Sequence, residues 1–220
     1  MEKIHFISGL GADERVFQFL HLNGFEQHFV KWESPFYHES LQSYCKRLII
    51  QLDLTNDVVL IGVSFGGIIA QEISKLILVK KVIIVSSIKS PSEFDWQLKI
   101  VRLLNLHKLA PAKFLKWANK YTANYYFGVE SNDETKLLGA IIEDTNTDFM
   151  VWAIDAILNW APFGKENVPI YHIHGTSDRI FPITNIKHKN TFFISKGGHF
   201  MIVNRSNEVS NLINQVLSLN

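Results

Sequence analysis

The chain has 220 residues, which suits one large domain with a substantial buried core and is rather little for two domains that each need a core. With 22 basic and 21 acidic residues the net charge is +1, so the chain lacks the positive field typical of nucleic-acid-binding proteins. Hydrophobic residues make up 47% of the chain and charged residues 20%, a composition that excludes an intrinsically disordered protein.

The apolar runs of the sequence are all short. None approaches the roughly 18 to 20 residues needed to span a bilayer, and the apolar stretch near Met1 is too short for a signal peptide. Cys45 is the single cysteine, so no disulfide can form within the chain, and its place on the apolar side of a helix predicts a core residue. We therefore expect a cytoplasmic protein without a membrane span.

Short apolar segments alternate with segments of helical spacing along the chain. The expected strands are Lys3–Ser8, Phe29–Glu33, Asp57–Val63, Lys80–Ser86, Val168–His174 and Thr191–Ser195. The expected helices outside the central insertion are Asp13–Leu22, Leu41–Leu52, one that follows Ser64 and runs to about Leu78, and Asn207–Leu217. Strands that are apolar on both faces and alternate with helices predict an α/β fold, with a mostly parallel sheet of roughly six strands and helices on both faces.

A long insertion separates the fourth and fifth expected strands. Residues 89–165 far exceed the usual connection of two to six residues, and they divide the chain into a core, 1–88 and 166–220, and an inserted unit that we expect to be a helical cap. The helices expected in it are Pro91–Asn105, Pro111–Tyr121, Asp133–Glu143 and Asp148–Trp160. The pair Ser131 and Glu134 predicts a capping box at the start of the third of these helices.

The strongest single signal is the pentapeptide G-x-S-x-G around Ser64, placed between an apolar strand and a helix. A serine on a sharp turn from strand to helix projects its hydroxyl above the edge of the sheet, and the crowded turn tolerates only small residues at Gly62 and Gly66. The pentapeptide alone would also suit a glycine turn that packs a helix on a strand. In its present context it predicts that Ser64 is a nucleophile.

Two partners for such a serine follow later in the chain, in the required order. Asp178 comes after the fifth expected strand and His199 after the sixth, so both lie at the C-terminal edge of the sheet with Ser64. We expect Asp178 to orient the imidazole and His199 to act as the base. The alternatives are a surface ion pair between Asp178 and Arg179, and a loop histidine without a catalytic role at position 199.

The sequence resembles the α/β-hydrolase fold superfamily over nearly its whole length. The resemblance is carried by Ser8 to Gly11 after the first strand, the turn Gly62 to Gly66, the stretch His174 to Asp178, and Gly198 with His199. It implies that Ser64 is the nucleophile, Asp178 the acid and His199 the base, with an oxyanion hole formed by the backbone N–H groups of Leu10 and Phe65. Many members have a histidine where this chain has Ser8, and many carry additional N-terminal antiparallel strands.

Other clusters of potentially reactive side chains are weaker signals. His172 and His174 are two residues apart on an expected strand and could ligate a metal with Asp178, but a metallohydrolase needs more ligands close by. We therefore expect packed, hydrogen-bonded histidines and neither a metal nor a cofactor. Cys45 has no motif that would predict a nucleophile.

The insertion is rich in aromatic residues and its charges are sorted. It holds Trp96, Trp117, Trp152, Trp160, Tyr121, Tyr125, Tyr126 and Phe127, most of which we expect to pack on the core and some to line a pocket. Basic residues dominate 89–120 and acidic residues dominate 121–160. Pairing between neighbouring cap helices would explain that sorting, and a docking face for an anionic acyl carrier is the alternative.

Together these features predict a serine hydrolase that cleaves a carboxylic ester or related acyl bond of a small, largely apolar substrate through an acyl-enzyme on Ser64. Three alternatives stay open. They are a non-hydrolytic or carbon–carbon-cleaving enzyme of the same fold, a ligand-binding receptor with little turnover, and a peptidase acting on short peptides. The sequence does not specify the acyl group, the alcohol or the oligomeric state.

Overall fold

A parallel sheet forms the centre of the molecule. The computed structural model describes residues 2–54, 57–105, 107 and 122–219. Six strands lie in the order β2-β1-β3-β4-β5-β6, and each neighbouring pair is parallel. The strands are β1 (Glu2–Ile7), β2 (Phe25–Phe29), β3 (Val58–Val63), β4 (Val79–Val85), β5 (Ile170–Gly175) and β6 (Thr191–Ile194). The predicted six-stranded α/β arrangement is confirmed.

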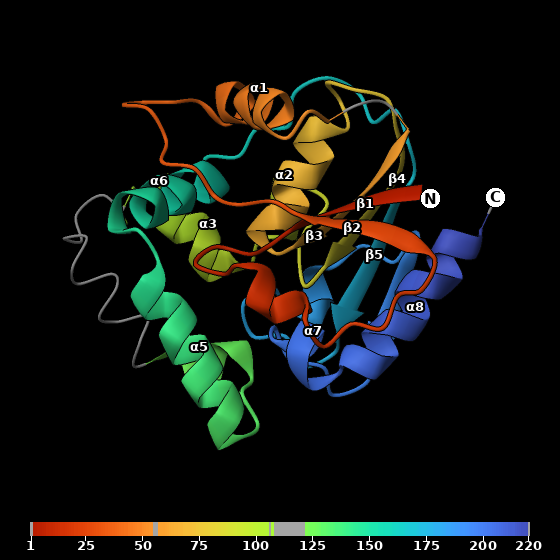
Figure 1. The fold of residues 1–220 in the computed structure, drawn as a ribbon. Helices are drawn as coiled ribbons and strands as arrows, with labels where there is room; N and C mark the ends of the chain where they lie inside the picture. Colours follow the sequence, from red (N-terminus) through yellow and green to blue (C-terminus); the bar gives the residue numbers. More distant parts are fainter. Residues whose placement is uncertain (1, 55–56, 106, 108–121, 220) are drawn as a thin grey trace.

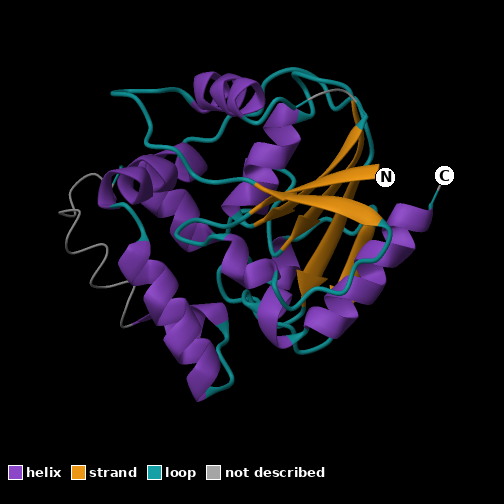
Figure 2. Ribbon diagram, viewed as in Figure 1, coloured by secondary structure: helices purple, strands orange, loops and turns teal. Residues whose placement is uncertain are grey.

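Helices cover both faces of this sheet, as Figures 1 and 2 show: α1 and α2 lie on one side, and α7 and α8 on the other. The α-helices with defined bounds are α1 (Leu41–Gln51), α2 (Phe65–Ile73), α3 (Trp96–Leu103), α5 (Asn132–Asp144), α6 (Thr147–Leu158), α7 (Met201–Asn204) and α8 (Ser206–Ser218). Residues 122–127 are also helical. Short 3-10 helices span Glu14–Phe17, Pro91–Glu93 and Ile183–Asn185. No helix within the described residues is long and apolar enough to cross a membrane.

The alternation of side chains along β3 explains why the sheet needs cover on both faces. Val58 and Leu60 belong to the apolar core on one face, whereas Val59 and Ile61 belong to the core on the other. All six residues of this strand are buried. Consecutive side chains of a strand point to opposite faces, so a strand that is apolar throughout is stable only between two layers of helices.

Two predictions near the N-terminus were wrong. The second strand runs from Phe25 to Phe29, not from Phe29 to Glu33, and pairs with β1 at the edge of the sheet. Its residues are half-buried or exposed, so it lacks the apolar run that marks the inner strands. The helix expected at 13–22 is only a 3-10 helix, Glu14–Phe17, since Val16 and Phe17 are buried as adjacent residues and not at helical spacing.

The described helices of the insertion lie close to their predicted positions, with one break. The segment expected as a single helix over 91–105 is a 3-10 helix followed by α3, because Asp95 starts a new helix by accepting a hydrogen bond from the Leu98 N–H at 2.8 Å. Ser131 caps α5 as predicted and accepts from the Glu134 N–H at 3.2 Å. The helix predicted at 111–121 lies outside the described residues.

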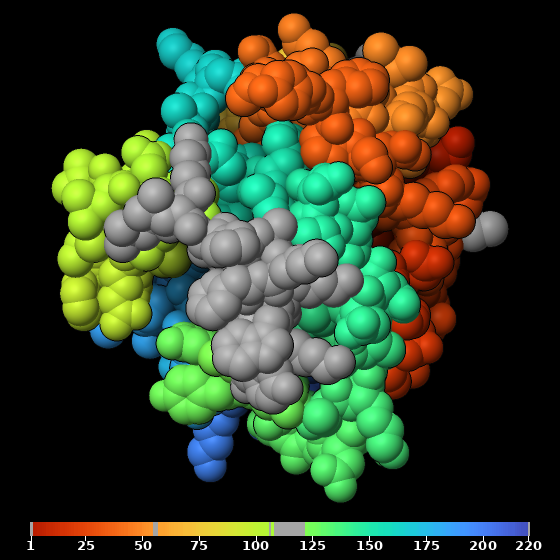
Figure 3. All heavy atoms as spheres, turned by 90° about the vertical axis from the view of Figure 1, so that its left-hand side faces the viewer, coloured from red at the N-terminus to blue at the C-terminus, as the bar shows by residue number. Residues whose placement is uncertain are grey.

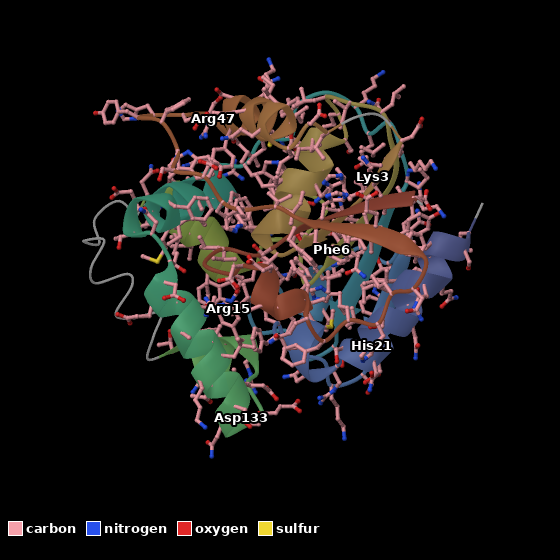
Figure 4. The ribbon with its side chains drawn as sticks, in the orientation of Figure 1. Lys3, Phe6, Arg15, His21, Arg47 and Asp133 are labelled. Carbon is pink, nitrogen blue, oxygen red and sulfur yellow. The ribbon has the colours of Figure 1, made fainter. Side chains whose placement is uncertain are left out.

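The insertion is attached to the core partly by charge. Arg15 of the core lies 2.8 Å from the carboxylate of Asp144 at the end of α5, and Arg205 lies 2.6 Å from Glu130 (Figure 4 labels Arg15). Asp144 and Glu130 therefore each have a cationic partner in the core. Atoms of α3, α5 and α6 spread over one end of the molecule, which faces the viewer in Figure 3.

A buried histidine of β1 predicts acid-sensitive stability. His5 is 6% exposed and stacks on His28 with 4.8 Å between the ring centroids. Burial lowers the pKa of His5 to about 4, and the neighbouring His28 and Lys3 act in the same direction. The unfolded chain, whose histidine has its ordinary pKa, binds this proton first as the pH falls. The contribution of His5 to stability is therefore present above about pH 6.5 and is lost between there and pH 4.

Replacing this side chain tests that account. His5→Phe is expected to reduce the loss of unfolding free energy between pH 7 and pH 5 by about 2 kcal/mol, because the variant has no proton to take up here on unfolding. Urea denaturation at both pH values measures the difference, and His188→Phe, a change of an exposed histidine beside the edge strand β6, serves as the control. An unchanged pH dependence in His5→Phe would show that His5 does not stay neutral in the folded protein.

Candidate active site

Ser64 occupies a strained turn between β3 and α2. Its φ is 75°, a left-handed value that residues with a side chain rarely adopt, and its N–H donates to the Val85 carbonyl at 3.0 Å. A Cβ added at Gly66 would overlap the carbonyl groups of Ile7 and Ser8, and one added at Gly62 would overlap the backbone of Gly66. Only glycine fits these two positions, so the turn has the crowded backbone that the sequence predicts.

Three side chains from three strand ends meet at this turn. Ser64 Oγ lies 3.0 Å from His199 Nε2, and His199 Nδ1 lies 2.8 Å from Asp178 Oδ2. Asp178 follows β5 and His199 follows β6, so both lie with Ser64 at the C-terminal edge of the parallel sheet. Asp178 and His199 are each 4% exposed. The structure thus places the predicted nucleophile, base and acid in one hydrogen-bonded series.

The carboxylate of Asp178 is held at both oxygens. Oδ1 accepts hydrogen bonds from the backbone N–H groups of Ile180 at 2.8 Å and Phe181 at 2.9 Å, while Oδ2 faces His199. Burial raises the pKa of this carboxyl, but the nearby His199 and the N–H donors outweigh burial and hold the pKa below its usual value. Arg179 does not pair with Asp178; it donates to the Tyr125 carbonyl.

The loop after β1 passes directly beside Ser64. A Cβ added at Gly9 would lie 3.3 Å from Ser64 Cβ, and Leu10 is the next residue. The loop is held by the carbonyl of Ala12, which accepts from Ser8 Oγ at 2.7 Å and from Trp32 Nε1 at 3.1 Å. Ser8 therefore orders the loop by a hydrogen bond.

Phe65, the second predicted oxyanion donor, begins α2. A backbone N–H in the first turn of a helix has no carbonyl partner within its own helix, and it lies at the positive end of the helix dipole. Gly9, Leu10 and Ser64 line one continuous cavity. Leu10 therefore lies at the wall of the cavity that Ser64 also lines, and Phe65 directly follows Ser64 in the chain.

That cavity has a volume of about 540 Å³ and lies between the sheet edge and the insertion. Ser64 and His199 line it on the core side. The insertion contributes mainly aliphatic side chains, among them Leu98, Leu138, Ile141, Met150 and Ile154. An apolar cavity next to a nucleophile suits a hydrocarbon group of a substrate.

The polar residues of the site were predictable from the sequence, whereas several residues that line the cavity beside them were not. The rings of Phe127 and Phe181 lie 5.3 and 5.6 Å from the His199 ring, both edge to face, and both residues line the cavity. His107 is a further lining residue, with Nε2 2.8 Å from Asp155 Oδ1. The sequence indicates the place of Phe181 in the site only by its position three residues after Asp178.

The described tryptophans of the insertion do not line the cavity. Trp152 packs on Tyr44, Trp160 is buried and donates to Glu72 Oε1 at 2.9 Å, and Trp96 is 68% exposed. Trp117 and Tyr121 lie outside the described residues. Of the aromatic residues expected to line a pocket, Phe127 does so.

The other candidate residues, His172, His174 and Cys45, are buried in the core. His172 and His174 are buried and hydrogen-bonded to each other, with 3.1 Å between His174 Nδ1 and His172 Nε2. Among the described residues no group of three or more potential metal ligands comes together. Cys45 of α1 is fully buried in the apolar core, and burial raises the pKa of its thiol.

Comparisons with known proteins agree with this architecture. No model of a protein family matches the chain, and no curated protein sequence does. Among solved structures, an esterase from Exiguobacterium antarcticum matches 100% of this chain and 92% of its own, with a TM-score of 0.74 and 17% identity. A thermophilic esterase from Thermogutta terrifontis matches 99% of this chain and 89% of its own, with a TM-score of 0.72 and 14% identity. The chain has the α/β-hydrolase fold.

A third match broadens the chemistry associated with this α/β-hydrolase fold. A bromoperoxidase from Bacillus anthracis matches 99% of this chain and 92% of its own, with a TM-score of 0.72 and 18% identity. Each match extends over nearly the whole of both chains. The predicted α/β-hydrolase fold is therefore confirmed, and proteins named as an esterase and as a bromoperoxidase share it.

Proposed function

We propose that this α/β-hydrolase-fold protein is a serine hydrolase that cleaves a carboxylic ester or a related acyl bond of a small, largely apolar substrate. The observation that carries the proposal is the hydrogen-bonded series from Ser64 through His199 to Asp178, open to an apolar cavity of about 540 Å³. The similarity to solved structures of esterases supports it.

In this proposal His199 Nε2 accepts the proton of the Ser64 hydroxyl as Oγ attacks the substrate carbonyl carbon. The N–H groups of Leu10 and Phe65 stabilise the oxyanion that forms. The tetrahedral intermediate then collapses, the alcohol leaves with the proton from His199, and the acyl group stays on Ser64. Water attacks the acyl-enzyme with His199 as base, and the carboxylic acid and the free serine are regenerated.

Asp178 acts here through His199. Its ionised carboxylate accepts the Nδ1–H of the imidazole, so the bare nitrogen of neutral His199 is Nε2, which faces Ser64. The same carboxylate stabilises the imidazolium formed during attack. Because its pKa lies below the ordinary value, Asp178 is ionised at neutral pH.

The insertion has a defined part in the proposal. Residues 1–88 and 166–220 form the catalytic core, and residues 89–165 act as a cap whose aliphatic side chains complete the wall around the acyl group. A cavity wall made of leucine, isoleucine and methionine offers burial but few hydrogen bonds. Recognition then depends on the apolar area that the substrate buries.

A series of p-nitrophenyl esters with unbranched acyl groups of increasing length tests the proposed substrate class. Each buried methylene contributes about 0.8 kcal/mol, so kcat/KM is expected to rise up to about fourfold per methylene until the cavity is filled. Chromatography should show the free carboxylic acid as the product, which separates hydrolysis from non-hydrolytic reactions of the same fold. An acyl-coenzyme A in the same series tests the carrier alternative.

Paired variants make the length dependence specific to the cavity. Leu138→Phe enlarges a buried lining residue and is expected to move the optimum to a shorter acyl chain. Ile50→Phe, at a side chain that is 79% exposed, should leave the optimum unchanged. A rate that falls steadily from the acetyl ester, or an optimum that Leu138→Phe does not move, would contradict an acyl group in this cavity.

A further inference from the structure

Two buried histidines lie behind the proposed acid and take no part in the proton transfers described above. His172 and His174 are both on β5, two residues apart, and point to the same face of the sheet. Neither side chain has any exposed surface. His174 Nδ1 lies 3.1 Å from His172 Nε2, and His174 Nε2 lies 2.8 Å from the carbonyl oxygen of Phe181. Both ring nitrogens of His174 are therefore engaged.

The partners of His174 define where its proton lies. A carbonyl oxygen only accepts, so the short contact with Phe181 requires a hydrogen on Nε2. Burial lowers the pKa of His174 and of His172 below the ordinary value, so each ring is neutral and has a single N–H. His174 Nδ1 is then bare and accepts from the Nε2–H of His172. The titratable groups that face His174 are His172, Asp178, His199 and Glu93.

Phe181 connects His174 to both of the proposed catalytic partners of Ser64. Its N–H donates to Asp178 Oδ1 at 2.9 Å, and its ring lies edge to face with the His199 ring at 5.6 Å. The carbonyl oxygen of the same residue accepts a hydrogen bond from His174 Nε2. His174 Nε2 is 4.0 Å from Asp178 Oδ2, too far for a direct hydrogen bond, so it acts on the carboxylate through the backbone of Phe181.

We propose that neutral His174 is a positioning residue, which holds the turn 178–181 so that Asp178 keeps its hydrogen bond to His199. His172 supports it by satisfying the second ring nitrogen. This inference rests on the proposed function, because the placement of Asp178 affects turnover only if His199 acts as the base. It assigns a role to a residue that does not touch the substrate or the reacting atoms.

Kinetics of His174 variants test the positioning role. His174→Phe fills the same space without a donor and is expected to lower kcat about 10- to 100-fold with little change in KM. A poorly held Asp178 stabilises the imidazolium of His199 less, so the acid limb of the kcat/KM profile should move to lower pH. His174→Gln restores an N–H that can reach the Phe181 carbonyl, and it should recover most of kcat and the original pH profile.

A matched control and a second variant complete the kinetic test. His5→Phe replaces another buried histidine of the same sheet and should leave kcat and the pH profile unchanged. If His174→Phe does not fold, His174→Asn keeps an amide that is too short to reach the Phe181 carbonyl and should show the same loss. A wild-type kcat in these variants, or a loss without a shifted pH profile and without rescue by glutamine, would overturn the proposal.

A spectroscopic measurement is independent of turnover. In protein labelled with ¹⁵N at histidine, the ring nitrogens of His174 should report a protonated Nε2 and a bare Nδ1 at pH 8. Protonation at His174 Nδ1 at this pH would contradict the proposed tautomer. If wild-type protein neither hydrolyses esters nor reacts at Ser64, the proposed function fails, while the nitrogen signals still show whether His174 holds the turn as inferred.

Discussion

Ser64→Ala is expected to abolish covalent labelling by a fluorophosphonate and to lower ester hydrolysis by a factor on the order of 10⁴ to 10⁶. The hydroxyl of Ser64 lies 3.0 Å from His199 Nε2 and is the only atom of that residue that can form the acyl bond. The methyl group of alanine leaves the strained turn and its glycines in place, so the fold should be retained. Intact-protein mass spectrometry measures the label.

The matched control is Ser43→Ala, which removes an exposed hydroxyl on α1 far along the chain from the turn. It should label and hydrolyse like the wild type. Peptide mapping of the labelled wild-type protein should locate the adduct at Ser64. Folded wild-type protein that does not label, or Ser64→Ala that still labels, would refute the serine mechanism and would favour a ligand-binding role.

Asp178→Asn is expected to lower kcat by about 10³- to 10⁴-fold while KM changes little. An asparagine oxygen can still accept from the N–H groups of Ile180 and Phe181, so its NH₂ group turns toward His199. His199 Nδ1 must then be bare, and the proton lies on Nε2, where it prevents the imidazole from accepting the proton of Ser64. Steady-state kinetics with the best ester substrate measure the loss of kcat.

Asp144→Asn provides the control for this change. Asp144 pairs with Arg15 at the junction of the insertion and the core, well outside the hydrogen-bonded series, and its loss should leave kcat unchanged. Circular dichroism should show that both variants are folded. Activity of Asp178→Asn within tenfold of the wild type would mean that Asp178 does not set the tautomer of His199.

The inner strands and the polar residues at their ends were predictable because their signals are local. Strand β3 is apolar at every position except Gly62, and the sharp turn at Ser64 needs glycine at 62 and 66 for reasons of backbone space alone. Edge strand β2 was misplaced because it is only half covered and its burial resembles that of a loop. The helix expected at 13–22 proved to be only the 3-10 helix Glu14–Phe17, whose buried apolar residues are adjacent.

The sequence by itself determined the α/β class and the identity of the three polar residues at the strand ends. It did so because a strand covered on both faces must be apolar and a tight turn must contain glycine, whatever the rest of the chain does. Tertiary structure alone decided which residues meet over long separations. Ser64 and His199 are 135 positions apart, and Arg15 and Asp144 are 129 apart.

The contacts around Asp178, the proposed acid, were also decided by the tertiary structure alone. No local pattern predicts that the Phe181 carbonyl accepts from His174 or that the Phe127 ring lies against His199. The same holds for the aliphatic wall of the cavity, which joins the core to a helical insertion. Contacts of this kind depend on how separate elements pack in three dimensions, and the free energy that selects them comes from burial of the whole surface and not from any one segment.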